Sequence, residues 1–176
     1  RWRLWIDGCG GYLLLAGERW TLGGVSHGML ADICVRADLP RQAGSIERVG
    51  GDYFWEDAQD NERRDLISNG HTLAIQGSAQ LTLRQPSALC DSAVLSLKPP
   101  HRFDQHVDAV VLANETVLVG PSPDCHIRCR DSVDRAVLIR RENQWLAKAG
   151  LAGTPEKLRP GHRTMLKTLA LTLEEA

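Results

Sequence analysis

The sequence predicts an all-β protein built from two tandem β-sandwiches of short antiparallel strands in one chain. Three observations lead to the all-β class and the duplication. The chain has 176 residues, enough for one mid-sized or two small domains. Apolar and polar residues alternate in short runs separated by Gly, Pro, Asn and Asp, and no stretch keeps the 3.6-residue period of a helix. Several short motifs also recur in the same order farther along the chain.

The internal repeat is clearest near the start of each copy. Residues 15–23 (LAGERWTLG) align with residues 112–120 (LANETVLVG), with four of nine positions identical. The Gly70-His71 pair recurs as Gly161-His162, and the triplet LTL at 81–83 recurs at 171–173. The separation falls from 97 residues at the first motif to 90 at the last, which indicates small deletions in the second copy.

Each copy contains eight predicted strands. In the first copy they are 2–7, 12–16, 19–23, 32–37, 43–49, 53–56, 71–76 and 80–85. In the second they are 93–98, 109–112, 116–119, 126–130, 136–141, 144–148, 163–166 and 169–174. Short strands at this spacing are typical of a sandwich. Residues 8–11, a glycine-rich run, fit a hairpin turn because glycine tolerates positive φ.

The joint between the copies is predicted at Gln85-Pro86-Ser87, because proline removes a ladder donor and resists continuation of a strand. The domains are therefore expected at 1–86 and 87–176. The joint holds few flexible residues, which favours two copies packed against each other over two copies on a free linker.

Composition excludes several classes of protein. A net charge of −1 lacks the basic excess of a nucleic-acid binder. No apolar run reaches the length of a membrane helix, so membrane insertion is not expected. The chain does not begin with Met, which suggests a segment of a longer polypeptide. Five scattered cysteines suit free thiols in a reducing cytoplasm, and a cytoplasmic location is expected.

The segment Cys125-His126-Ile127-Arg128-Cys129 is the one cluster with metal-binding character. As a strand, it would turn both cysteines and the isoleucine inward and direct His126 and Arg128 to solvent. Two thiolates without a second ligand pair do not make a zinc site, so we expect buried structural cysteines and no metal or cofactor.

No catalytic constellation is apparent in the sequence. Residues 57–65 hold four carboxylates, but two arginines are interleaved with them, and such a run is typical of an exposed, mixed-charge loop. The protein is therefore expected not to be an enzyme.

Each copy resembles a forkhead-associated (FHA) domain, a β-sandwich whose end loops recognise phosphothreonine peptides. The family pattern is a strand ending in Gly-Arg, an Asp-Ile-type strand, Ser-Arg-x-His, a hydrophobic strand, an Asn-Gly loop, and a glycine turn before two closing strands. The framework positions are matched in both copies by Gly23 and Gly120, and by Ile33 and Ile127. The turn before the closing strands is matched by residues 67–70 and 158–161. The chain is similar in particular to degenerate tandem FHA-like segments of multidomain bacterial signalling proteins.

The resemblance implies that the phosphate-binding positions of the first copy are largely changed. Gly24 replaces the arginine after the first glycine, Pro40 replaces the phosphate-binding serine, and Ala43 replaces the structural histidine. Arg41 retains the neighbouring basic residue, and Asn61 is the nearest candidate for the peptide-binding asparagine.

The second copy keeps more of this chemistry. Pro121 replaces the first arginine, while Ser132 occupies the serine position. Val133 stands at the following arginine position and Arg135 at the histidine position.

Two functions remain open from these residues. The first is a non-catalytic protein-interaction or scaffold module with degenerate phosphate-binding loops. The alternative is a phosphothreonine-peptide reader that uses Ser132 and Arg135, with Arg41 and Asn61 contributing from the first copy. The expected partner is accordingly a protein or a phosphopeptide.

Overall fold

The computed structural model describes residues 1–25, 31–60, 62–77 and 79–176, and its regular elements are all β-strands. The all-β class is therefore confirmed. The first strands are β1 (Trp2–Ile6), β2 (Gly10–Ala16), β3 (Arg19–Gly24), β4 (Ile33–Val35), β5 (Gly44–Val49), β6 (Asp52–Asp57), β7 (Arg64–Leu66), β8 (Thr72–Ala74) and β9 (Gln80–Arg84). The others are β10 (Ala93–Leu97), β11 (Ala109–Ala113), β12 (Thr116–Gly120), β13 (Ile127–Arg128), β14 (Ala136–Arg141), β15 (Gln144–Ala149), β16 (Glu156–Lys157), β17 (Arg163–Leu166) and β18 (Leu169–Glu175).

Two five-stranded sheets have the same internal arrangement. Their strand orders are β4-β3-β5-β6-β7 and β13-β12-β14-β15-β16. In each, the first pair is parallel and the other pairs are antiparallel. Positions that match in sequence also match in register, because Trp20 lies opposite Ile46 and Val117 lies opposite Leu138. The sequence repeat thus corresponds to a repeat of strand pairings.

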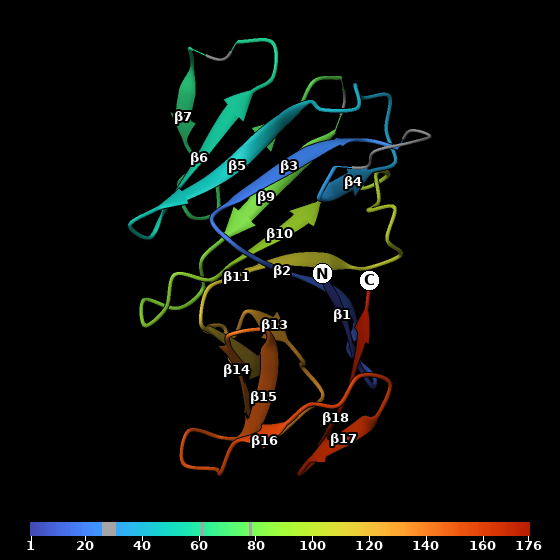
Figure 1. Cartoon of the computed structure of the whole chain (residues 1–176), viewed down its shortest axis with the longest axis vertical. Helices are drawn as coiled ribbons and strands as arrows, with labels where there is room; N and C mark the ends of the chain where they lie inside the picture. Colours follow the sequence, from blue (N-terminus) through green and yellow to red (C-terminus); the bar gives the residue numbers. More distant parts are fainter. Residues whose placement is uncertain (26–30, 61, 78) are drawn as a thin grey trace.

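The third sheet joins the copies. It has eight strands in the order β17-β18-β1-β2-β11-β10-β9-β8. The five-stranded sheets pack on its two halves, so β2 and β11 run through the middle with one copy on either side (Figure 1). Leu13 faces the first core and Leu14 the second, which is why β2 is apolar on both faces.

The central pair is parallel and pairs residues that are 97 positions apart, such as Leu13 with Val110. The repeat has this same separation between Gly23 and Gly120. Matching strands of the two copies therefore lie side by side at the centre of the molecule, and the copies form a packed pair.

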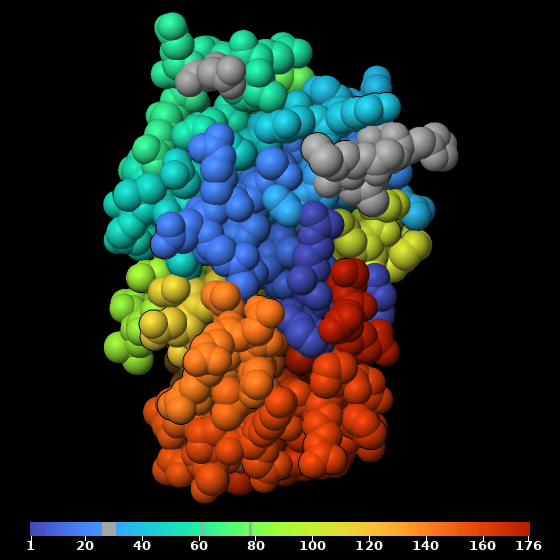
Figure 2. Space-filling model, in the orientation of Figure 1, coloured from blue at the N-terminus to red at the C-terminus, as the bar shows by residue number. Residues whose placement is uncertain are grey.

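The two cores exchange a strand. Strand β1 pairs with β18, and its Leu4 and Ile6 lie in the core of the second copy. Strand β10 pairs with β9, and its Ala93 and Leu95 lie in the core of the first copy. Figure 2 shows the consequence, with the dark-blue N-terminal residues lying against the red C-terminal ones at the waist. The boundary expected at residue 86 follows the sequence repeat, but each core also takes side chains from two strands beyond it, β10 and β11 in the first copy and β1 and β2 in the second.

The sequence did not predict two short strands, β7 and β16. They have three and two residues, lie at sheet edges, and consist mainly of charged side chains. Alternation cannot be detected over so few residues. Strand β7 overlaps the end of the segment 57–65 that the sequence indicated as an exposed loop, so the expectation was wrong for the last two residues of that segment.

Candidate functional site

The loops that the resemblance implicates lie at the ends of β12 and β13 in the second copy. Arg135 joins the segment that follows β12 to the segment that precedes β14. Its Nη1 donates to Asp124 Oδ2 at 3.1 Å, and its Nη2 donates to Ser122 Oγ at 2.7 Å and to Asp124 Oδ1 at 3.2 Å. A guanidinium that donates to both oxygens of a carboxylate has its positive charge compensated within the protein.

Ser132 is directed to different partners from those of Arg135. Its hydroxyl donates to the Asp134 carbonyl at 3.0 Å and accepts from the Asp134 N–H at 3.2 Å. The Asp134 carboxylate in turn accepts from the Thr168 hydroxyl at 2.6 Å. That bond, with Lys167 nearby, holds the pKa of Asp134 below its ordinary value. The two predicted phosphate ligands of this copy are therefore engaged in separate internal networks.

In the first copy, the Arg41 side chain is exposed. The contact of this loop with β3 is made by the Arg41 backbone carbonyl, which lies against Gly23, and not by the guanidinium. The Gly24 N–H donates to the Pro40 carbonyl at 2.8 Å, which brings the loop before β5 against the end of β3. Asn61 lies outside the described residues. Sequence reasoning did not single out Ser122 or Asp124, because an Arg–carboxylate pair between two loops leaves no spacing signal.

Glycine is required at the framework position 23 for a steric reason. A Cβ at this position would overlap the carbonyl of Arg41, so only glycine allows this approach of the two loops.

We expect Gly23→Ala to lower the free energy of unfolding by roughly 2 kcal/mol. Gly70→Ala is the control, because Gly70 has open space around it and only its φ of 78° resists a side chain. Its cost should be about 1 kcal/mol. Chemical denaturation measures both, and equal losses would contradict this account of Gly23.

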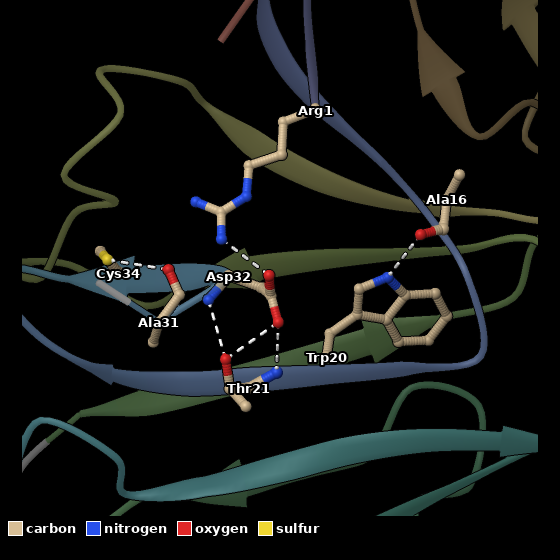
Figure 3. A network of polar contacts seen from close by, with 7 residues as sticks. All are labelled: Arg1, Ala16, Trp20, Thr21, Ala31, Asp32 and Cys34. Atoms are coloured by element: carbon tan, nitrogen blue, oxygen red, sulfur yellow. Dashed lines mark hydrogen bonds and ion pairs between the residues drawn. The ribbon is translucent and has the colours of Figure 1, made fainter. Parts of the chain in front are cut away.

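A polar side chain fastens the start of β4 to β3. Asp32 Oδ2 accepts from the Thr21 N–H and hydroxyl, both at 2.9 Å, while Arg1 donates to its other oxygen at 2.7 Å (Figure 3). Partial burial raises the pKa of Asp32, but these donors outweigh it and hold the pKa below its ordinary value. In the same view Cys34 donates to the Ala31 carbonyl at 3.3 Å, which satisfies this buried thiol locally.

In the second copy, His126 has the role that Asp32 has in the first. It aligns with Asp32 in the repeat, and its Nδ1 accepts from the Leu118 N–H at 3.0 Å. Because Nδ1 is the acceptor, the proton resides on Nε2, which lies 3.2 Å from the Ser92 carbonyl. The ring is 1% exposed, so the expectation that it faces solvent was wrong. Cys125 and Cys129 are buried, as the alternation of that segment predicted.

Burial lowers the pKa of His126 to about 4. The ring is therefore neutral at pH 7 and acts as a structural acceptor. Nearby, Arg84 of β9 donates to the His126 carbonyl at 2.7 Å, which ties the first copy to the second at this point.

A pocket of about 650 Å³ opens between the edge strands β7 and β8. Trp55 and Leu73 line it, together with carboxylates from the 57–65 segment. Asp57 accepts from the Gln59 N–H at 2.8 Å and from the Gln76 side chain at 3.0 Å, while Asp65 pairs with Arg63 at 2.9 Å. These contacts account for two of the carboxylates as structural groups.

Comparisons of the chain with models of known protein families, with curated proteins and with solved structures gave no match. Within the described residues, no helix is long and apolar enough to cross a membrane. The same part of the chain contains no cluster of three or more His, Cys, Asp or Glu residues suited to a metal ion.

Proposed function

We propose that this protein is a non-catalytic protein-interaction module of the FHA type. In its loops, the side chains at the phosphate-binding positions form hydrogen bonds within the protein instead. The observation that carries the proposal is the engagement of Arg135 by Asp124 and Ser122. A phosphate entering here would have to displace an internal carboxylate from the guanidinium, which removes most of the gain from a charge-assisted bond.

The exposed apolar side chains of the same loops support binding that does not depend on phosphate. Val133, at the position where the family has arginine, is 83% exposed. Val25, directly after Gly24 in the first copy, is 51% exposed. Loops that present valine instead of arginine suit an apolar partner surface better than an anionic one.

The resemblance places such a module in the cytoplasm, within a larger bacterial signalling protein. The five cysteines are free thiols in the structure, which agrees with a reducing compartment. The alternative function, a phosphothreonine reader, uses the same loops and is decided by the same experiment.

The test is calorimetric titration of the chain with a peptide library in which each sequence is present in a phosphothreonine form and an unphosphorylated form. We expect the two forms of any bound sequence to have affinities within about threefold of each other, a difference below 1 kcal/mol. Val133→Ser, which removes the apolar contact without adding charge, should weaken both forms equally. A preference of more than about tenfold for the phosphorylated form would contradict the proposal and support the reader.

Asp124→Asn is the informative variant because it removes the charge that engages Arg135. We expect a gain in affinity of roughly tenfold for phosphorylated peptides only, since one charge-assisted bond of about 1.5 kcal/mol or more becomes possible. Asp131→Asn, in the neighbouring loop between β13 and β14, is the matched control and should leave both affinities unchanged. If Asp124→Asn gives no selective gain, Arg135 fails to bind phosphate for a reason other than its pairing with Asp124.

A further inference from the structure

Two cysteines from distant parts of the sequence meet where the β1–β2 hairpin packs on the second copy. Cys9 lies in the turn before β2, and Cys129 lies just beyond β13. Both line a pocket of about 180 Å³, together with Asp7 and Asp131. Cys9 Sγ is 3.6 Å from the Arg128 carbonyl and packs against the core that contains Cys129.

The two thiols differ in exposure. Cys129 is 5% exposed and belongs to the core, whereas Cys9 is partly exposed at the pocket wall. Of the two thiols that line the pocket, Cys9 is therefore the more accessible to a small oxidant. The Tyr12 hydroxyl lies 3.4 Å from Cys9 Sγ.

The surrounding groups favour the thiolate at Cys9. Interaction with the Cys129 thiol lowers the pKa of Cys9 to about 7, and the Tyr12 hydroxyl contributes in the same direction. Partial burial and the carboxylates of Asp108 and Asp131 oppose this shift. The same interaction raises the pKa of Cys129, so that Cys129 stays a thiol. The thiolate is the form of cysteine that reacts with peroxides.

We propose that Cys9 is a peroxide-reactive site and that Cys129 resolves it into an intramolecular disulfide. The Cys9 thiolate attacks one oxygen of hydrogen peroxide and the O–O bond breaks. Hydroxide leaves and is protonated to water, so the sulfur becomes a sulfenic acid and the peroxide is reduced by two electrons. Cys129 then gives up its proton and attacks the Cys9 sulfur. The S–S bond forms, the S–O bond breaks, and a second water leaves.

The product would fasten the exchanged hairpin to the core that it completes. The bond would join two residues that are 120 positions apart in the sequence. Cross-links across long loops restrict the unfolded chain most strongly, so the oxidised protein should melt at a higher temperature than the reduced one. The same pocket is also lined by Ser132 and Val133 of the candidate binding loop. The oxidation is measured on the chain without a partner, so its outcome does not depend on the proposed function.

The experiment treats the reduced full chain with equimolar hydrogen peroxide at neutral pH and maps the product by mass spectrometry. We expect an intact mass about 2 Da lower, from the two lost hydrogens, and one linked peptide pair that contains Cys9 and Cys129. Dithiothreitol should restore the mass. In Cys129→Ser the reaction should stop at a Cys9 sulfenic acid that dimedone traps. The matched control, Cys90→Ser, changes another partly exposed thiol and should form the disulfide as the wild type does.

A disulfide between other cysteines, or oxidation distributed over several thiols, would overturn the proposal. A second readout uses the wild type alone and so avoids any folding defect in the variants. The rate of Cys9 alkylation by iodoacetamide should level off near pH 8, because its thiolate forms at about pH 7. A rate that keeps rising above pH 9, as for an ordinary thiol, would also contradict the proposal.

Discussion

Replacing Leu4 with alanine is expected to lower the free energy of unfolding by about 3 kcal/mol. Leu4 has no exposed surface, and it packs in the core of the second copy although it lies at the start of the first. The truncation leaves a cavity between β1 and the sheet of β12, β14 and β15, so the loss combines transfer free energy with cavity formation. Because the cores share the sheet through β2 and β11, both copies should unfold in one transition.

Urea denaturation followed by tryptophan fluorescence measures this effect. Trp20 lies in the first core and Trp145 in the second, so single-tryptophan versions report on each copy separately. Leu89→Ala is the matched control, since Leu89 is 93% exposed and its loss should cost less than 0.5 kcal/mol. A Leu4→Ala variant that destabilises only the first copy, or neither, would show that β1 does not complete the second core.

The second large effect is a loss of stability in mild acid that depends on His126. In the unfolded chain this histidine takes up a proton near pH 6.5, whereas in the folded protein it does so only near pH 4. Between these values the unfolded state binds more protons, so its population grows as the pH falls. The contribution of His126 is complete above pH 6.5 and is lost progressively toward pH 4, by about 3 kcal/mol in total.

The test compares urea midpoints of the wild type and His126→Asn at several pH values from 7 to 4. Asparagine offers an acceptor for the Leu118 N–H and does not titrate. The difference in unfolding free energy between the two proteins should shift in favour of the variant as the pH falls. A difference that stays constant over this range would mean that the His126 ring is accessible to protons in the folded state.

Much of the fold could be predicted because it follows from local patterns. The motifs around Gly23 and Gly120 mark equivalent strand ends in both copies, and alternation locates most strands to within a residue or two. The exchange of β1 and β10 could not be predicted, since both hairpins have the same local pattern whichever core they complete. Only long-range pairing, such as that of β1 with β18, decides this.

The site was harder to predict than the fold. The residues aligned with phosphate ligands, Ser132 and Arg135, are present, but Arg135 is bound by Ser122 and Asp124 of the preceding loop, and Ser132 by the Asp134 backbone. His126 shows a second limit. Alternation predicts an outward side chain, but the ring has the same role as Asp32 in the repeat and turns to the neighbouring backbone instead. That equivalence is visible in the sequence only after the register of both copies is known.

The state of Arg135 tests the central claim most directly. We expect its guanidinium to remain bound to Asp124 when a phosphothreonine peptide is added. The measurement is the Arg135 Nε–H resonance in a nitrogen-15 labelled sample titrated with a phosphothreonine peptide to millimolar concentration. An unchanged resonance in the wild type, with a saturable shift in Asp124→Asn, is the predicted result. A saturable shift in the wild type would contradict the account and identify the second copy as a phosphate-binding site.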